Sequence, residues 1–166
     1  MATFKTTKAT NNDAQPPVHN ESYKSGGKIR VWKGTHEITA AYTTADILVL
    51  DRIPWNISID QIWLGWDDLN SSTLPADLGW YYPDGTVGDV DEFASSVPLG
   101  TGTVMSVEEF EAAGGDIDRM GKLAWEWFGL TTHPGGNGWD LCLTLGTNGG
   151  TTAAGTISWR VTGTME

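Results

Sequence analysis

The side chains that could carry catalytic or metal chemistry are few and scattered in this 166-residue chain. Three histidines, His19, His36 and His133, lie in segments predicted to be loops, and none is paired with another at the spacing of zinc ligands. Cys142 is the single cysteine, and no histidine lies close to it in sequence to activate the thiol. A buried or interface thiol is therefore a better interpretation than a nucleophile.

Carboxylates are the other candidate chemistry, because seven of them gather in one stretch: Asp67, Asp68, Asp77, Asp84, Asp89, Asp91 and Glu92. Calcium takes oxygen ligands in such numbers, but the spacing does not match an EF-hand loop. The segment Gly100–Gly102 lacks the lysine and the helix signal of a phosphate-binding loop. The sequence predicts solvated loops here and indicates no catalytic residue, no cofactor and no metal.

Charge and composition exclude several classes of partner. The formal net charge of −11 repels phosphate backbones and anionic membranes, so neither nucleic acid nor a membrane is the expected partner. The first residues show no apolar signal segment, and a single cysteine suits a reducing compartment, so we expect synthesis in a cytoplasm. Nine tryptophans and 21 glycines favour a folded β protein with many turns over a disordered chain.

The elements that would position these side chains are mostly strands. The most apolar stretch, residues 45–69, is predicted to build the core. Within it, Ile47–Leu50 is an unbroken apolar run, which predicts a strand buried on both faces, and Pro54 interrupts it.

The next predicted strand changes phase along its length. Its apolar residues are Ile57 and Ile59, then Ile62, Leu64 and Trp66. The two groups have opposite parity, and the change falls at Asp60-Gln61. Such a shift predicts either a β-bulge or a strand that passes between two packing environments. In the second case Trp63 or Trp66 would reach another surface.

Three further alternating segments are predicted to be strands. Lys28–Trp32 carries Ile29 and Val31 on one face and is expected to be half-buried, with a turn near Gly34. Two clean alternating strands, Trp139–Leu145 and Ile157–Val161, are expected to form a hairpin.

Helical signals are short. Asp89–Glu92 has the form of a helix start. Thr103–Phe110 could be either a helix start or a strand, and the two are equally favoured. A helix is predicted over Asp118–Phe128, where Trp125 and Trp127 cannot both face one core.

The sequence therefore predicts an all-β fold, a β-sandwich or jelly roll with one or two short helices, over residues 26–166. Residues 1–25 form a weakly basic, proline-containing extended arm, which is either a floppy terminus or a segment that orders on an acidic partner. The candidate interface residues are Pro16, Pro17, Tyr23, Trp66, Trp80, Tyr81, Tyr82 and Trp125.

Several short stretches resemble, in order and spacing, a family of small tailed-bacteriophage virion proteins encoded near the major capsid protein. They are Gly27–Val31, Ala45–Ile53, Ile57–Leu64, Asp67-Asp68, Asp84–Thr86, Asp91–Ser95, Gly121–Glu126, Gly129-Leu130, His133–Gly136, Leu141–Leu145 and Ala154–Ser158. The resemblance covers roughly residues 26–162. It implies a jelly-roll decoration (cement) protein on the capsid exterior, with the major capsid protein as partner and without catalytic residues.

An acidic body with a separate arm and spare aromatic residues suits this role, and a symmetric homo-oligomer is expected, with a trimer favoured. Two alternatives remain open. One is another virion component, such as a head–tail or tail-associated protein. The other is a carbohydrate-binding module that uses Trp66 and the cluster Trp80–Tyr82.

Overall fold

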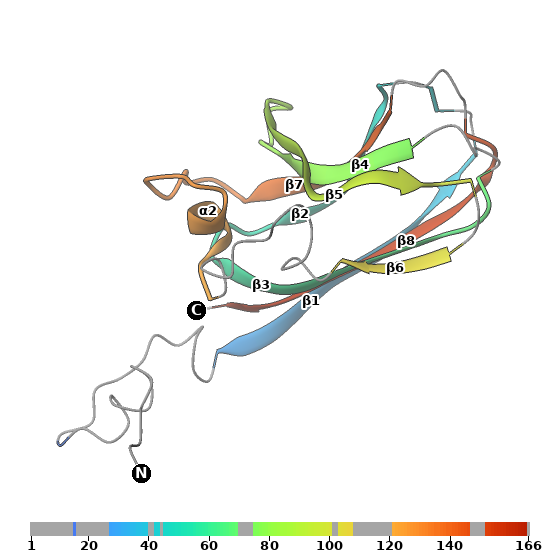
Figure 1. Ribbon diagram of the computed structural model, residues 1–166. Helices are drawn as coiled ribbons and strands as arrows, with labels where there is room; N and C mark the ends of the chain where they lie inside the picture. Colours follow the sequence, from blue (N-terminus) through green and yellow to red (C-terminus); the bar gives the residue numbers. More distant parts are fainter. Residues whose placement is uncertain are drawn as a thin grey trace, which may run out of the picture.

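The computed structural model describes Gln15 and residues 27–39, 42–43, 45–69, 75–100, 103–107, 121–146 and 152–165. Eight strands and one short helix make up the regular structure of these residues (Figure 1). They are β1 (Lys28–Ile38), β2 (Ile47–Ile53), β3 (Ile57–Trp66), β4 (Pro75–Tyr81), β5 (Val87–Pro98), β6 (Thr103–Val107), α2 (Ala124–Trp127), β7 (Trp139–Leu145) and β8 (Gly155–Met165).

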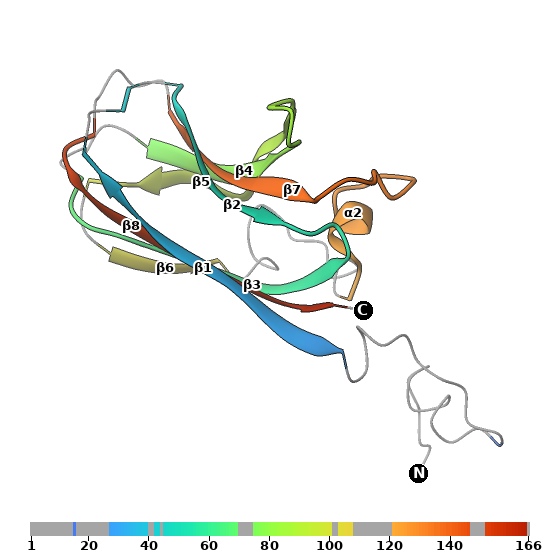
Figure 2. The same ribbon diagram turned by 180° about the vertical axis from the view of Figure 1, so that it is seen from behind.

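The strands form two four-stranded sheets in the orders β1-β8-β3-β6 and β2-β7-β4-β5. Every described strand pair is antiparallel. The sheets lie face to face as two layers, and the chain crosses repeatedly from one to the other (Figures 1 and 2). This order is that of an eight-stranded jelly roll. The prediction of an all-β sandwich is confirmed.

One predicted connection is wrong. Strands β7 and β8 do not form a hairpin, because β7 pairs with β2 and β4 in one sheet and β8 pairs with β1 and β3 in the other. Their alternating apolar residues face each other's layer across the core instead of lying side by side. Alternation identifies the buried face of a strand, but it does not identify the strand's neighbours.

The core fills the space between the two sheets. Its largest fully buried side chains include Trp139, Phe93, Ile53, Ile57, Ile62, Leu64, Leu78 and Leu141. Trp139 and Trp159 are both buried, as their phase in the sequence predicted. Each buried side chain of this size contributes about 1.5–3 kcal/mol relative to an exposed one, so the sheet-to-sheet contact is the main stabilising contact of the fold.

A β-bulge at Asp60 explains the phase change in β3. Along the β3–β8 ladder, Ile59 pairs with Gly163 and the next pair is Gln61 with Thr162, so Asp60 is an extra residue. The extra residue turns the second half of β3 by one position, and the apolar residues on both sides of the bulge face the same core. Of the two predicted alternatives the bulge is correct. Trp66 is buried, whereas Trp63 lies on the outer side.

Strand β1 runs without interruption through Gly34, where a turn was expected. Gly34 pairs with Trp159 of β8, and a methyl group at Gly34 would lie 2.2 Å from Cζ2 of the Trp159 indole. The glycine is therefore needed for the close approach of an aromatic ring, and it does not mark a turn.

Strands β1 and β2 each lie at an edge of their sheet, on the same side of the sandwich (Figure 2). Apolar side chains on their outer faces remain exposed, including Ile29 and Val31 of β1 and Ile47 and Val49 of β2. The prediction that Ile47–Leu50 is buried on both faces is therefore wrong. An unbroken apolar run also occurs where only one face meets the core.

The helical predictions are largely overturned. Asp89–Glu92 lies within β5, because pairing with β4 overrides the local helix-start signal. Residues 103–107 form β6, which decides the open alternative for the described part of that segment in favour of a strand. The predicted helix over Asp118–Phe128 is reduced to one turn, Ala124–Trp127, with residues 118–120 outside the described part.

Deleting Asp60 tests the bulge. We expect the variant to fold with a loss of unfolding free energy within about 1 kcal/mol, because Ile59 and Gln61 then occupy consecutive places on β8 with unchanged faces. Deleting Ile62 is the control and should cost more than about 3 kcal/mol, since either Gln61 takes its core position or the following residues reverse faces. Denaturant unfolding followed by circular dichroism measures both, and equal losses would contradict the bulge.

Candidate functional site

Three of the aromatic residues predicted to meet a partner belong to the core instead. Trp66, Trp80 and Tyr81 are each no more than 6% exposed. Strand β4 lies between β7 and β5, and its Trp80 ring stacks on Phe128 with the centroids 4.3 Å apart. On the other face of β4, the Tyr81 hydroxyl lies 2.8 Å from the Thr144 hydroxyl. The prediction is therefore corrected for these residues, because their rings are already covered by their own protomer.

The other predicted interface residues are either half-buried or outside the described part of the chain. Tyr82 is half-buried against Trp80, with ring centroids 5.1 Å apart. Trp125 is half-buried beside His133, with centroids 6.2 Å apart. Pro16, Pro17 and Tyr23 lie outside the described residues. The structure therefore brings Tyr82 and Trp80 together but does not gather the predicted residues into one surface.

The titratable candidates have structural roles. Cys142 is fully buried, and burial is the main cause that raises the pKa of its thiol to about 12, with the charge of Asp140 adding to the effect. The thiol therefore stays protonated at neutral pH, as expected for a buried rather than a nucleophilic cysteine. His133 accepts a hydrogen bond from the Gly135 N–H at 3.0 Å and lies in the loop that precedes the turn at residues 136–137.

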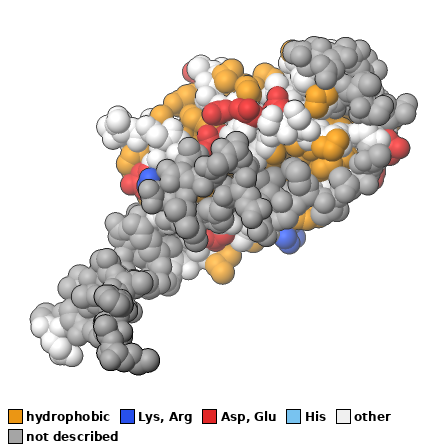
Figure 3. Space-filling view, in the orientation of Figure 1, with side chains coloured by type: hydrophobic (Ala, Val, Ile, Leu, Met, Phe, Trp, Pro, Cys, Tyr) orange, Lys and Arg blue, Asp and Glu red, His pale blue; other side chains and the backbone are white. Residues whose placement is uncertain are grey.

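The acidic residues of β4 and β5 crowd one another. The pKa of the Asp91 carboxyl is raised, chiefly by a side-chain hydrogen bond with Asp89, then by desolvation and by the negative charges of Asp89 and Asp77. Figure 3 shows acidic side chains beside hydrophobic ones on the visible face, with Lys and Arg only as isolated spots. Within the described residues no group of three or more His, Cys, Asp or Glu is arranged to hold a metal ion.

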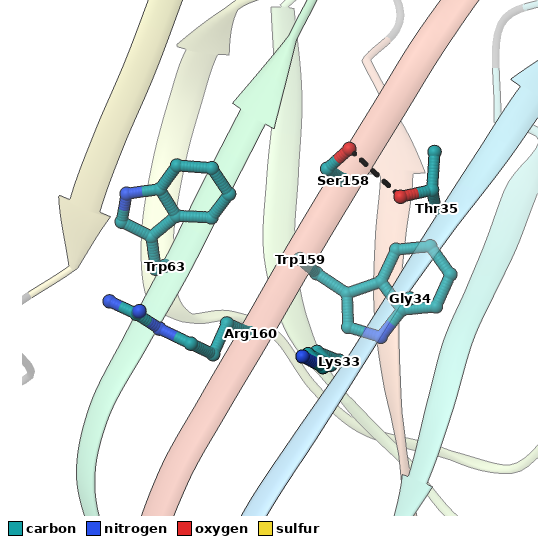
Figure 4. Close-up of a pocket in the computed structure, with 7 residues that line it drawn as sticks. All are labelled: Lys33, Gly34, Thr35, Trp63, Ser158, Trp159 and Arg160. Atoms are coloured by element: carbon teal, nitrogen blue, oxygen red, sulfur yellow. Dashed lines mark hydrogen bonds between the residues drawn. The ribbon is translucent and has the colours of Figure 1, made fainter.

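A different set of residues forms a hollow on the outside of the sheet that contains β1, β8 and β3. Lys33, Arg160 and Trp63 are cross-strand neighbours in one row, and Thr35 and Ser158 follow in the next outward-facing row. The hollow has a volume of about 470 Å³ and is lined by Lys33, Gly34, Thr35, Trp63, Ser158, Trp159 and Arg160 (Figure 4). We call this surface, together with Ile29 and Val31, the outer β1–β8–β3 face.

Electrostatically, this face is cationic. The guanidinium carbon of Arg160 lies 5.8 Å from the centroid of the Trp63 ring, within the range of a cation–π contact. Among the described residues Arg52 forms an ion pair with Asp140 at 2.6 Å, whereas no carboxylate there pairs with Lys33 or Arg160. Two cations that pair with none of the described carboxylates therefore stand on a protein whose net charge is −11.

The face is also apolar along β1. Ile29 is 70% exposed and Val31 is 51% exposed, and both project from the same side of the strand as Lys33. Sequence reasoning placed this pair in a half-buried strand and missed the surface. The available signal was parity, because Ile29 and Val31 alternate in phase with polar Lys33, Thr35 and Glu37, while Trp32 and Ile38 have the opposite phase.

Comparison with known proteins gives matches only in structure. No protein-family model matches the chain, and no curated protein matches it. A chain in the capsid asymmetric unit of cyanophage Pam1 superposes with a TM-score of 0.57 and 16% sequence identity, covering 90% of this chain and 93% of that one. A chain in the capsid of Ralstonia phage GP4 superposes with a TM-score of 0.59 and 18% identity, covering 84% and 86%. Among the described residues no helix could span a membrane.

Two tryptophan substitutions distinguish the core from the outer face. Trp80→Ala should cost about 3–5 kcal/mol of unfolding free energy, because it leaves a cavity beside Phe128. Trp63→Ala should cost less than about 1 kcal/mol, because it removes a surface ring and one cation–π contact. Denaturant titrations of both variants measure the difference. A comparable loss for the two would contradict the assignment of Trp63 to the outside.

Proposed function

We propose that this protein is a structural component of a tailed-bacteriophage virion that binds the outer capsid surface as a decoration, or cement, protein. The observation that carries the proposal is the jelly roll shared, over at least 84% of the chain, with chains from the capsids of two phages. The resemblance of short stretches within residues 26–162 points in the same direction.

The proposed action is passive. The partner is the major capsid protein, and each bound copy adds contact area across the joints between capsid subunits. A homotrimer at local threefold sites would bind through three equivalent contacts, so the effective concentration multiplies weak individual contacts into stable attachment. The acidic body supports this role, because like charge keeps many closely spaced copies soluble.

The division into an arm and a body is part of the proposal. Residues 26–166 form the jelly-roll domain, and residues 1–25 form an arm that orders on the capsid. The arm joins the body at β1, whose first residue is Lys28. It therefore enters the fold at the sheet that carries the outer β1–β8–β3 face.

Purified virions test the proposal. We expect a copy number comparable to that of the major capsid protein, measured by quantitative mass spectrometry. Electron cryomicroscopy should show the protein as threefold clusters on the outside of the head. A few copies at a single vertex would replace this proposal with that of a head–tail or tail-associated component.

Deletion of residues 1–25 tests the arm. The truncated protein should keep its folded body, because the eight strands of the two sheets all lie within residues 28–165. Its occupancy on capsids should fall at least about tenfold if the arm supplies contacts worth 1.4 kcal/mol or more. Co-sedimentation with capsids that lack the protein measures occupancy, and circular dichroism of the same sample confirms folding. Unchanged occupancy would remove the arm from the binding model.

A further inference from the structure

We propose that the outer β1–β8–β3 face is the surface that docks on the capsid, and that its occupant is an acidic protein surface whose carboxylates bind Arg160 and Lys33. This inference rests on the proposed function, and it names both the contact surface and the chemistry of the partner.

The arrangement of Trp63 and Arg160 is the first argument. The Arg160 guanidinium is already held against the indole ring, so little side-chain freedom remains to be lost on binding. Its planar donors match a carboxylate, and Lys33 stands directly beside it across the strand pair. Tryptophan and arginine are also the residues that most often dominate binding energy in protein interfaces.

The shape of the face is the second argument. The hollow of about 470 Å³ lies between Trp63 on β3 and Lys33 on β1, over the middle of β8 (Figure 4). Its other wall carries the Thr35 and Ser158 hydroxyls, which lie 3.2 Å apart. A protruding acidic side chain could enter this hollow and meet both cations, while the hydroxyls offer further donors.

Exposed apolar area next to the cations is the third argument. Ile29 and Val31 continue the face along β1, and water would leave their side chains on docking. An apolar area bordered by polar and charged groups is the usual composition of a protein–protein interface. Surface lysines and arginines without an apolar area beside them would not distinguish an interface from the rest of the protein surface.

Charge complementarity decides between occupants. A second copy bound through the same face would bring a second Lys33 and Arg160 into the same interface, and this gathering of like charges is repulsive. An acidic partner surface is repelled by most of this protein, whose net charge is −11, and is attracted by this face. On the same strands the carboxylates stand to either side of the cationic row, Glu37 two outward-facing rows beyond Lys33 and Asp60 at the bulge. At this row a carboxylate would meet two cations at once.

The test is binding of the full chain to purified capsids that lack the protein. The double variant K33E/R160E and the single variant Trp63→Ala should each bind at least about tenfold more weakly than the natural chain. Lys122→Glu is the control, because Lys122 precedes α2 and is not among the residues that line the hollow, so reversing its charge should leave affinity nearly unchanged. Circular dichroism checks that each variant is folded, and if the double variant is not, Lys33→Glu alone replaces it.

A second experiment probes the chemistry of the partner surface. Capsids whose surface carboxyl groups have been converted to neutral amides should bind the natural chain at least about tenfold more weakly. Binding should also weaken as the salt concentration rises.

The outcomes separate the two proposals. If the natural chain does not bind capsids, the proposed function fails. If it binds and the face variants bind equally well, the function stands and the docking face is overturned. The same conclusion follows if Lys122→Glu weakens binding as strongly as the double variant. Variants that change the sedimentation of the free protein but keep their capsid affinity would assign this face to contacts between copies. Unaltered binding to amidated capsids would overturn the acidic partner.

Discussion

The burial of one face of each sheet against the other is the constraint on which the rest of this structure depends. Every strand must present its apolar residues to the same interior, and β3 can do so only because Asp60 is left out of the ladder. If Asp60 instead took a regular place in the ladder, one half of β3 would present its apolar residues to water. The same bulge leaves Trp63 on the outside, next to Arg160. The bulge thus decides both which side chains of β3 reach the core and which lie on the outer surface.

The core also explains why most of the tryptophans are unavailable to a partner. Trp55, Trp80 and Trp139 surround Phe128 in a cluster of edge-on and stacked rings at one end of the sandwich. Helix α2 stands at that end, and Trp127 of this helix donates a hydrogen bond to Glu92 of β5 at 2.9 Å. A jelly roll has open ends between its sheets, and here aromatic rings close one of them. Their abundance is largely a feature of the interior.

How far the sequence predicts this fold depends on the element. Strict alternation identified the buried faces of β7 and β8, and the parity change in β3 located the bulge to within one residue. The neighbours of β7 and β8 could not be predicted, because each of these strands pairs with strands that are distant in sequence. The outer face was missed for a related reason. Ile29 and Val31 are β-branched residues of a kind common in cores, and they are exposed because they project from the outer face of the sheet.

That edge position has a consequence for the protein before assembly. In the described part of the chain no strand pairs with the free side of β1, so its backbone amides and carbonyls are open to another strand. Flat apolar edges of this kind promote aggregation, and charged residues, lysine above all, are a common defence. Lys28, Arg30 and Lys33 occur at close intervals along β1 and are all exposed. Lys33 also belongs to the outer face, and the three cations together would keep newly made copies apart through mutual repulsion.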